Sequence, residues 1–289
     1  MIEYLYLGRV DYGEALRLQK EMVELRRQGR IDNVLLLLEH PPVLTLGRNA
    51  IRANVLATDE LLARRGVTLH QINRGGDVTY HGPGQLIGYP IFDLRSLRNS
   101  AGGRLGPVDF VRLMEEALIR LCGVYRVQAG RICGLTGVWC PADGSSLDEC
   151  RVRTAAPPPG ATKIAAIGIH VSRGITSHGF AFNLTTNLND FALINPCGIV
   201  NCAVTSLARE MADGETAMPS LEAAAHEAAR LFGQVFGQQV LAVESLDTLR
   251  ARAEAAQASA PEFPAEDTPL RVPPEVERLR SVRERPVRA

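Results

Sequence analysis

The chain of 289 residues has very little lysine: Lys20 and Lys163 are the only two among 32 lysines and arginines. Arginine supplies a positive charge almost anywhere, but it effectively never loses its proton, whereas a lysine ammonium does so in a suitable environment. A lysine kept in such a chain is therefore a candidate for proton transfer. Lys20 lies in a charged helical pattern that suggests no role. Lys163 lies in an apolar, glycine-bearing stretch and is the first candidate for chemistry.

Long apolar segments are lacking as well. The longest aliphatic run, 34–38, is far shorter than the roughly 20 residues of a membrane-spanning helix, and residues 1–7 have neither the basic nor the apolar part of a signal peptide. We therefore expect a cytoplasmic protein. The formal net charge of zero gives no bulk attraction to nucleic acid or to an anionic membrane. A hydrophobic content of 46% indicates an ordinary globular protein with a substantial core.

The six cysteines show no metal-binding pattern. They form no C-x-x-C pair and do not alternate with histidine at the spacing of a zinc site, so we predict no metal site. In a cytosolic chain most cysteines are inert, buried and small, and we expect at most one or two to take part in chemistry. The positions are 122, 133, 140, 150, 197 and 202.

Strand patterns outnumber helix patterns and do not alternate strictly with them. This mixture predicts an α+β fold with a mixed, largely antiparallel sheet packed with helices. The predicted strands are 2–7, 33–39, 67–72, a short one after 74–76, 86–94, 124–128, 135–139, 163–172, 178–184 and 239–243. The predicted helices are 12–28, a short one after Thr58, 107–121, one from Ser220, and 245–258.

Two segments fall outside this pattern. Residues 141–160 are polar and rich in Pro, Gly and Ser, which predicts a surface insertion. Beyond Ser245 a helical stretch is followed by 261–289, where Pro, Arg and Glu dominate and where we expect disorder. We therefore predict one catalytic domain over 1–244 and a C-terminal extension over 245–289, helical in its first part.

The block 74–90 is the densest in glycine, with five in a short span. Glycines allow a backbone to approach a ligand closely, so the block could wrap an extended ligand, with Arg74 and His81 as polar contacts. The alternative is an ordinary pair of turns in a β-meander. The block is not a phosphate loop, because no Gly-Lys-Ser/Thr follows and no G-x-G-x-x-G opens a helix.

Cys197 lies between proline and glycine in Asn195-Pro196-Cys197-Gly198-Ile199. A tight turn of this kind can point a thiol into a cleft, which suits a nucleophile; the alternative is a buried structural cysteine. Cys202 fits the structural alternative better.

A free thiol is mostly protonated at neutral pH, because its pKa is about 8.5. A neighbouring ammonium favours the thiolate, so Lys163 is a candidate partner for Cys197. A conventional Cys/His pair that uses His81, His170 or His178 competes with this hypothesis, although structural roles are favoured for His170 and His178 taken singly.

Four motifs in order resemble the lipoyl/octanoyl transferases of lipoic-acid biosynthesis, in the biotin/lipoate protein ligase superfamily. They are RGGDVTYHGPGQLIGYPI from residue 74, KIAAIGIH from 163, HGFAFNL from 178 and NPCGI from 195, and the likeness spans about 2–243. The resemblance implies octanoyl transfer from octanoyl-acyl carrier protein to a lysine of a lipoyl domain, through an acyl-thioester on cysteine and without a cofactor. Lipoyl domains of 2-oxoacid dehydrogenase complexes and the glycine cleavage H protein would be the acceptors.

The resemblance also assigns roles to residues. Cys197 matches the acylated nucleophile, and Lys163 matches the lysine that lowers the pKa of its thiol. The segments that match the substrate site are Arg74, Gly75, Gly76, Asp77, Val78, Thr79, Tyr80, His81, Ala166, Ile167, Gly168, Gly179, Phe180 and Ala181. The insertion 141–160 and the tail after Ser245 are longer than the family core requires.

Three other functions compete with this one. An ATP-dependent lipoate or biotin ligase shares the fold, but the chain lacks a G-R-G-R-x-G-R run and has the Pro-Cys-Gly element; a requirement for ATP would decide. A lipoyl-binding relative without catalysis is disfavoured because Lys163 and Cys197 are both present. A papain-like hydrolase would need a helix-borne cysteine with an orienting Asn/His pair, which the pattern does not show.

Overall fold

The structure is a computed structural model that describes residues 1–99, 102–142, 147, 154, 156–195, 203–211 and 217–258. Its centre is an eight-stranded sheet in the order β11-β1-β2-β6-β10-β9-β8-β7. β1 runs parallel to β2 and β11, and the other neighbours are antiparallel, which confirms the mixed, largely antiparallel sheet. The strands are β1 (Ile2–Arg9), β2 (Asn33–Glu39), β6 (Gln85–Ile91), β7 (Gly130–Ile132), β8 (Leu135–Cys140), β9 (Thr162–Ser172), β10 (Ile175–Asn183) and β11 (Val240–Ala242).

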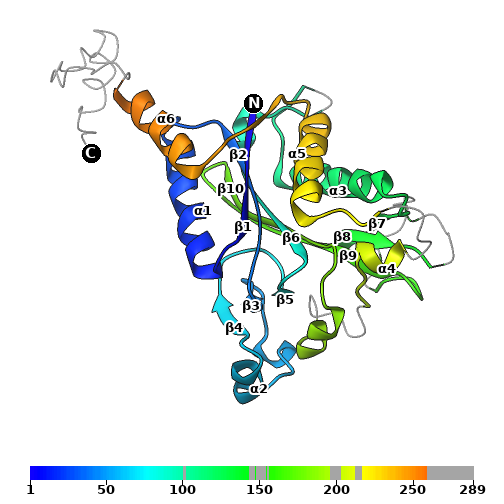
Figure 1. Cartoon of the computed structure of the whole chain (residues 1–289). Coiled ribbons are helices and arrows are strands. Elements are labelled where there is room, and N and C mark those ends of the chain that lie inside the picture. Colours follow the sequence, from blue (N-terminus) through cyan, green and yellow to red (C-terminus); the bar gives the residue numbers. More distant parts are fainter. Residues whose placement is uncertain are drawn as a thin grey trace, which may run out of the picture.

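Helices cover both faces of this sheet. α1 (Tyr12–Arg27) and α6 (Leu246–Ala258) lie on one side, and α3 (Pro107–Val124) and α5 (Leu221–Phe236) lie on the other (Figure 1). β2 shows how the strand pleat serves both layers, because its side chains alternate between faces. Leu35 and Leu37 join the core beneath α3 and α5, whereas Val34, Leu36 and Leu38 join the core beneath α1 and α6.

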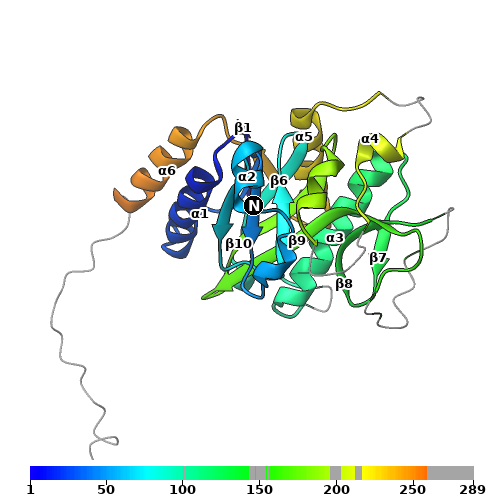
Figure 2. The same cartoon turned by 90° about the horizontal axis from the view of Figure 1, so that it is seen from below.

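A three-stranded sheet extends from this body, in the order β4-β3-β5. Its strands are β3 (Val43–Leu46), β4 (Thr68–Gln71) and β5 (Val78–His81), and α2 (Asp59–Arg64) begins after its predicted N-cap, Thr58. In Figure 1, α2 lies at the opposite end of the molecule from the N-terminus, and the view from below in Figure 2 shows α1 and α6 side by side. β3 was not predicted, because four residues directly after Pro41-Pro42 are too few to show an alternating pattern.

The predicted strand 124–128 is wrong. α3 runs on to Val124 and then closes with two hydrogen bonds, from the Val127 amide to the Cys122 carbonyl and from the Arg126 amide to the Gly123 carbonyl, both 3.0 Å. Arg126 has φ of 59°, so this is a Schellman ending with arginine at the position that glycine usually takes. The missing glycine hides the helix end in the sequence.

The strand pair through Arg173-Gly174 is confirmed. β9 and β10 form a hairpin with a two-residue loop, and positive φ angles of 51° at Arg173 and 85° at Gly174 fit a type I′ turn. The turn fixes the register, which places Gly168 opposite Gly179 and Ala166 opposite Ala181. The same register brings two segments of the predicted site side by side.

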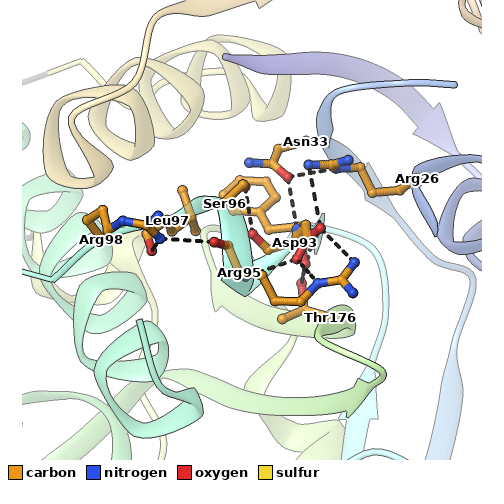
Figure 3. A network of polar contacts seen from close by, with 9 residues as sticks. Arg26, Asn33, Asp93, Arg95, Ser96, Leu97, Arg98 and Thr176 are labelled. Carbon is orange, nitrogen blue, oxygen red and sulfur yellow. Dashed lines mark hydrogen bonds and ion pairs between the residues drawn. The ribbon is translucent and has the colours of Figure 1, made fainter. Parts of the chain in front are cut away.

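Asp93, just after β6, ties several elements together (Figure 3). Its carboxylate accepts two hydrogen bonds of 2.9 Å from the Arg95 guanidinium and a third, also 2.9 Å, from the Arg95 amide. Its own amide donates to Asn33 Oδ1 on β2, and Arg26 of α1 lies 3.9 Å from the carboxylate. Hydrogen bonds from Arg95 lower the pKa of Asp93, so its carboxylate is ionised at neutral pH.

The helix α6 is part of the packed body. Leu249 and Ala253 are buried against α1, and Arg250 contacts both oxygens of Glu21 at 2.7 and 2.9 Å. The predicted helix 245–258 is therefore confirmed, and its buried face belongs to the same core as 1–244. Most of the predicted insertion 141–160 and all of 261–289 lie outside the described residues. None of the helices in the described part is both long and apolar enough to cross a membrane.

Candidate active site

The predicted substrate segments surround a narrow cavity of about 60 Å³. It lies between the loop before β5 and the paired strands β9 and β10. Of the predicted substrate-site residues, all but Tyr80 line it. The lining residues are Tyr12, Arg74, Gly75, Gly76, Asp77, Val78, Thr79, His81, Tyr89, Ala166, Ile167, Gly168, His178, Gly179, Phe180 and Ala181.

Glycines in this wall let backbones touch. A Cβ on Gly168 would lie 2.9 Å from the carbonyl oxygen of Gly75, and a Cβ on Gly179 would collide with the carbonyl oxygen of Gly88. The amide of Gly75 donates to the carbonyl of Ile169 at 3.0 Å, so the loop rests directly on β9. Backbone atoms therefore bound part of this narrow slot.

Arg74 anchors the loop rather than reaching freely into the cavity. It is buried, and its guanidinium donates to the carbonyl oxygen of Thr45 at 2.7 Å, to Thr45 Oγ1 at 2.9 Å and to the carbonyl of Gly75 at 2.9 Å. These bonds connect β3 to the loop and fix the positive charge beside the cavity.

Tyr80 takes the opposite side of β5. Its hydroxyl donates to Asp190 at 2.9 Å and its ring packs edge-on against Phe191, while Thr79 and His81 face the cavity. The alternation of a strand explains the split, because neighbouring side chains point to opposite faces. Tyr80 thus supports the wall from behind.

Two buried histidines line the cavity. His81 Nδ1 is 2.9 Å from Gln85 Oε1, and burial lowers the pKa of His81 to about 3. His178 Nε2 is 2.8 Å from Asn73 Oδ1, and burial lowers its pKa to about 4. Both imidazoles are therefore neutral at physiological pH, and neither supplies a positive charge. His170 lies elsewhere, on the outer part of the β9–β10 hairpin opposite Ser177.

Lys163 sits at the adjoining end of the slot. A small second cavity of about 10 Å³ is lined by Lys163, and it shares Thr79, Ala166 and Ala181 with the larger one. The lysine is only 5% exposed. Its Nζ donates to the carbonyl oxygen of Thr136 at 3.3 Å and lies 4.5 Å from the centroid of the Trp139 ring, within range of a cation–π contact.

A β-bulge aims this lysine. Val138 pairs with Ala165, but Trp139 pairs with Lys163, so Ile164 is an extra residue on β9. Bulges are frequent beside active sites because they redirect one side chain without ending the strand. Here the bulge leaves Ile164 in the core while the ammonium lies over Trp139.

The backbone of Lys163 also holds the chain that follows Cys197. Its amide donates to the carbonyl of Ala203 at 2.9 Å, and the amide of Thr205 donates to the carbonyl of Lys163 at 2.9 Å. On the other side of the gap, the amide of Asn195 donates to the carbonyl of Asn54 at 2.7 Å. Cys197 itself lies outside the described residues, which stop at 195 and resume at 203.

A chain of side-chain hydrogen bonds connects the slot to this segment. Gln85, the partner of His81, donates to Asn183 Oδ1 at 2.8 Å, and Asn183 Nδ2 donates to the carbonyl of Thr205 at 2.8 Å. All four are buried. Fully bonded buried amides of this kind fix one arrangement, because any other leaves polar groups unpaired.

The remaining cysteines differ in their surroundings. Cys122 and Cys140 are free and buried, and burial raises the pKa of both thiols, that of Cys140 to about 12. They are the inert cysteines that the sequence predicted. Cys133 is disulfide-bonded, while 150 and 202 lie outside the described residues. Within the described part of the chain, no group of three or more His, Cys, Asp or Glu residues is arranged to hold a metal ion.

Sequence reasoning missed several residues of the site. Tyr12 and Tyr89 line the slot, and Thr136 and Trp139 surround the ammonium. Tyr12 looked like the first residue of an amphipathic helix, and Thr136 contributes only its backbone carbonyl, for which a sequence has no signal. Tyr89 lies within the glycine-rich block 74–90, so of these four residues it was the easiest to predict from the sequence.

Comparison with known proteins identifies the family of this chain. The model of the lipoyl protein ligase A/B catalytic domain matches residues 11–228. The octanoyltransferase of Acidobacterium capsulatum is 58% identical over 246 residues, which cover 85% of this chain and 94% of that protein. The octanoyltransferase of Koribacter versatilis is 49% identical over 262 residues, which cover 91% and 95%.

Solved structures show the same fold at low identity. A bi-partite lipoate protein ligase from Thermoplasma acidophilum has a TM-score of 0.61 at 15% identity over 90% of this chain and 93% of that chain. Lipoate-protein ligase A bound with ATP has a TM-score of 0.60 at 14% identity over 90% and 95%. From the matched domain and these closely similar relatives, the chain belongs to the family of the lipoyl protein ligase A/B catalytic domain.

Proposed function

We propose that this protein is an acyltransferase that moves an octanoyl group from octanoyl-acyl carrier protein to a lysine of lipoyl domains, through an acyl-thioester on Cys197. The observation that carries the proposal is the position of Lys163. The side chain of Lys163 is buried at the end of the slot. Its backbone is hydrogen-bonded to Ala203 and Thr205, which follow Cys197 closely in the sequence. The similar octanoyltransferases support the same reaction class.

In the first step, the Cys197 thiolate attacks the carbonyl carbon of the octanoyl thioester. A new carbon–sulfur bond forms, the bond to the carrier sulfur breaks, and the Lys163 ammonium gives its proton to the departing thiolate. The ammonium also stabilises the Cys197 thiolate before attack, as an opposite charge lowers a thiol pKa. Lysine suits both tasks because it can exchange the proton.

In the second step, the amine of the target lysine attacks the octanoyl-cysteine. The carbon–nitrogen bond forms, the carbon–sulfur bond breaks, and Lys163 takes the proton that the amine loses, which restores the ammonium and the thiolate. His81 and His178 are less suited to the first step, because their low pKa values leave them neutral. The slot holds the acyl chain along β9 and β10 while the thioester is exchanged.

The acceptors in this proposal are the lipoyl domains of 2-oxoacid dehydrogenase complexes and the glycine cleavage H protein. Both protein substrates would approach the slot in turn, since each must place one reactive atom at Cys197. The cytoplasmic location stays a prediction from the sequence.

Intact-mass spectrometry tests the proposal. Purified protein incubated with octanoyl-acyl carrier protein, without ATP, should gain one octanoyl group that hydroxylamine removes, and peptide mapping should place it on Cys197. Cys197→Ala should gain none, whereas the matched Cys202→Ala should behave as the parent. An adduct on another residue would overturn the thioester assignment, and transfer that depends on ATP would favour a ligase with the fold of the ATP-bound relative.

A further inference from the structure

We infer that Glu115 is a positioning residue for Lys163 and acts through the peptide group that joins Thr136 to Gly137. The inference rests on the proposed function, because it concerns how the Lys163 ammonium is held for that reaction. Glu115 belongs to α3, on the opposite side of β8 from the slot, and no motif in the sequence pointed to it.

Glu115 is fully buried, and both oxygens of its carboxylate have polar partners. Its Oε1 accepts a hydrogen bond from the Gly137 amide at 3.0 Å, while its Oε2 lies 2.6 Å from Arg112 and 3.3 Å from Arg131. Burying a charge is costly unless it is paired and hydrogen-bonded. The two arginines compensate the charge, but they do not explain why one oxygen is aimed at a backbone amide of β8.

That amide shares a peptide plane with the lysine's acceptor. The carbonyl oxygen of Thr136 accepts the hydrogen bond from Lys163 Nζ at 3.3 Å, and the N–H of the same peptide is that of Gly137. A trans peptide is rigid and its C=O and N–H point in opposite directions. Glu115 therefore fixes the direction of the carbonyl that faces the ammonium. A carboxylate on the N–H also polarises that carbonyl toward the positive charge.

Gly137 makes the contact sensitive to small movements. It has φ of 125°, and a Cβ at this position would lie 2.6 Å from the carbonyl oxygen of Ala165 and 3.4 Å from Lys163 Cε. The peptide thus packs against the lysine stem with no side chain between them. A rotation of this peptide would move the acceptor of the ammonium and the surface that supports its stem together.

Two substitutions separate the effect of the length of the Glu115 side chain from the effect of its charge. Glu115→Gln keeps an oxygen at the same reach for the Gly137 amide and removes the charge opposite the arginines. Glu115→Asp keeps the charge and withdraws the oxygen by one methylene. If Glu115 positions Lys163, the aspartate variant is the damaged one. If Glu115 only balances Arg112 and Arg131, the glutamine variant is the damaged one.

The readouts are the rate of octanoyl loading on Cys197 and the apparent pKa of its thiol, from the pH dependence of iodoacetamide alkylation mapped to that residue. We expect Glu115→Asp to slow loading roughly tenfold and raise the thiol pKa by about one unit. Glu115→Gln should stay within about threefold of the parent in loading. Glu116→Asp and Glu116→Gln, on the neighbouring half-exposed residue, are matched controls and should leave both readouts unchanged.

The outcomes separate the two claims. If the parent protein acquires no octanoyl group on Cys197, the proposed function fails. If the parent loads normally and a folded Glu115→Asp loads at the same rate with the same thiol pKa, the positioning role is overturned. Loss of both readouts in Glu115→Gln but not in Glu115→Asp also overturns it. Thermal unfolding of each variant identifies any that fails to fold, and the remaining one still decides, because the two substitutions have opposite expectations.

Discussion

The amide nitrogen of Lys163 lies 2.9 Å from the carbonyl oxygen of Ala203, so the lysine is bonded through its backbone to the chain that follows Cys197. One residue thereby has two functions. Its backbone fixes where the segment returns to the sheet, and its side chain brings an ammonium to the end of the slot. A substitution of the side chain leaves the backbone bonds possible, which makes the chemistry testable apart from the fold.

Lys163→Arg and Lys163→Ala should both impair transfer, for different reasons. Arginine keeps the positive charge that favours the Cys197 thiolate, so loading should be slowed less than transfer, but it can neither protonate the departing carrier thiolate nor take the proton of the incoming amine. Alanine removes the charge as well, so Lys163→Ala should slow both steps. Loss of a positioned proton acceptor costs roughly a hundredfold to ten-thousandfold. Single-turnover measurement of loading and transfer separates the steps. Full-rate transfer by Lys163→Arg would contradict the base role, and Lys20→Arg, on an exposed residue of α1, is the matched control.

The sequence anticipated this lysine, but not what surrounds it. A rare lysine that lies between a glycine-rich block and a Pro-Cys-Gly segment is visible in the order of residue types. The carbonyl of Thr136 and the carboxylate of Glu115 are not, because one is a backbone group and the other lies on a helix face that looks like any charged position. The roles of Thr136 and Glu115 depend on contacts between segments far apart in the sequence, and the residue types within one segment do not predict such contacts.

Acid should weaken the fold through its buried histidines. His40 is fully buried, with Nδ1 donating to the Val10 carbonyl and Nε2 accepting from Tyr89, both at 2.7 Å, and burial lowers its pKa to about 4. An unfolded histidine titrates near 6.5, so the unfolded state binds the proton first as the pH falls. The stability is therefore present above about pH 6.5 and is lost between that pH and about 4.

For His40 the effect is on the order of a few kcal/mol, because each pKa unit between the folded and unfolded states corresponds to about 1.4 kcal/mol. Urea unfolding at a series of pH values should show a free energy of unfolding that declines below pH 6.5 in the parent and declines less steeply in His40→Gln. His81 and His178 contribute in the same direction, since their pKa values are lowered to about 3 and about 4. An equal decline in His40→Gln would show that His40 does not remain neutral in the fold.

Gly168→Ala should damage acyl binding more than stability. The added methyl would lie 2.9 Å from the Gly75 carbonyl oxygen and 3.4 Å from Arg74 Cδ, so the loop must lift from β9 and the slot must change width. We expect a higher KM for the octanoyl donor and a fall in kcat/KM of up to about a hundredfold. Steady-state kinetics measures both.

The same substitution at Gly123 is its control. Nothing lies within 4 Å of a Cβ placed there, and the residue is in the exposed last turn of α3. Gly123→Ala should leave kcat/KM unchanged and raise the free energy of unfolding by about 0.5–1 kcal/mol. Equal kinetics in the two variants would show that the close approach at Gly168 does not shape the slot.

Leu249→Ala should destabilise the whole domain. Leu249 of α6 is completely buried in the core beneath α1. Removal of a buried leucine side chain costs roughly 2–5 kcal/mol. Guanidinium unfolding should show one transition at a lower midpoint. Leu56→Ala, at a residue 55% exposed, should change the midpoint little. A second, separate transition in the parent would mean that α6 unfolds independently of the catalytic fold.

The sequence pattern predicted the helix α6 but not its packing against the body of the protein. Its helical pattern was readable, but a buried face of only Leu249 and Ala253 resembles the composition of a solvated helix. The same limit explains the wrong strand at 124–128, where an arginine adopts the left-handed backbone usual for glycine. The strands β2, β9 and β10 were predicted well because a continuous or alternating apolar pattern survives in any surroundings.

The pairing of β1 with β11 has a consequence for the order of synthesis. β1 precedes β11 by more than 200 residues in the sequence, so one edge of β1 stays unpaired until residues 240–242 lie parallel to it, and α6 then packs against α1. An uncovered strand edge readily pairs with another chain. Until residues 240–242 have been synthesised, this edge of β1 therefore has no strand partner, and a segment far away in the sequence removes the risk of pairing with another chain.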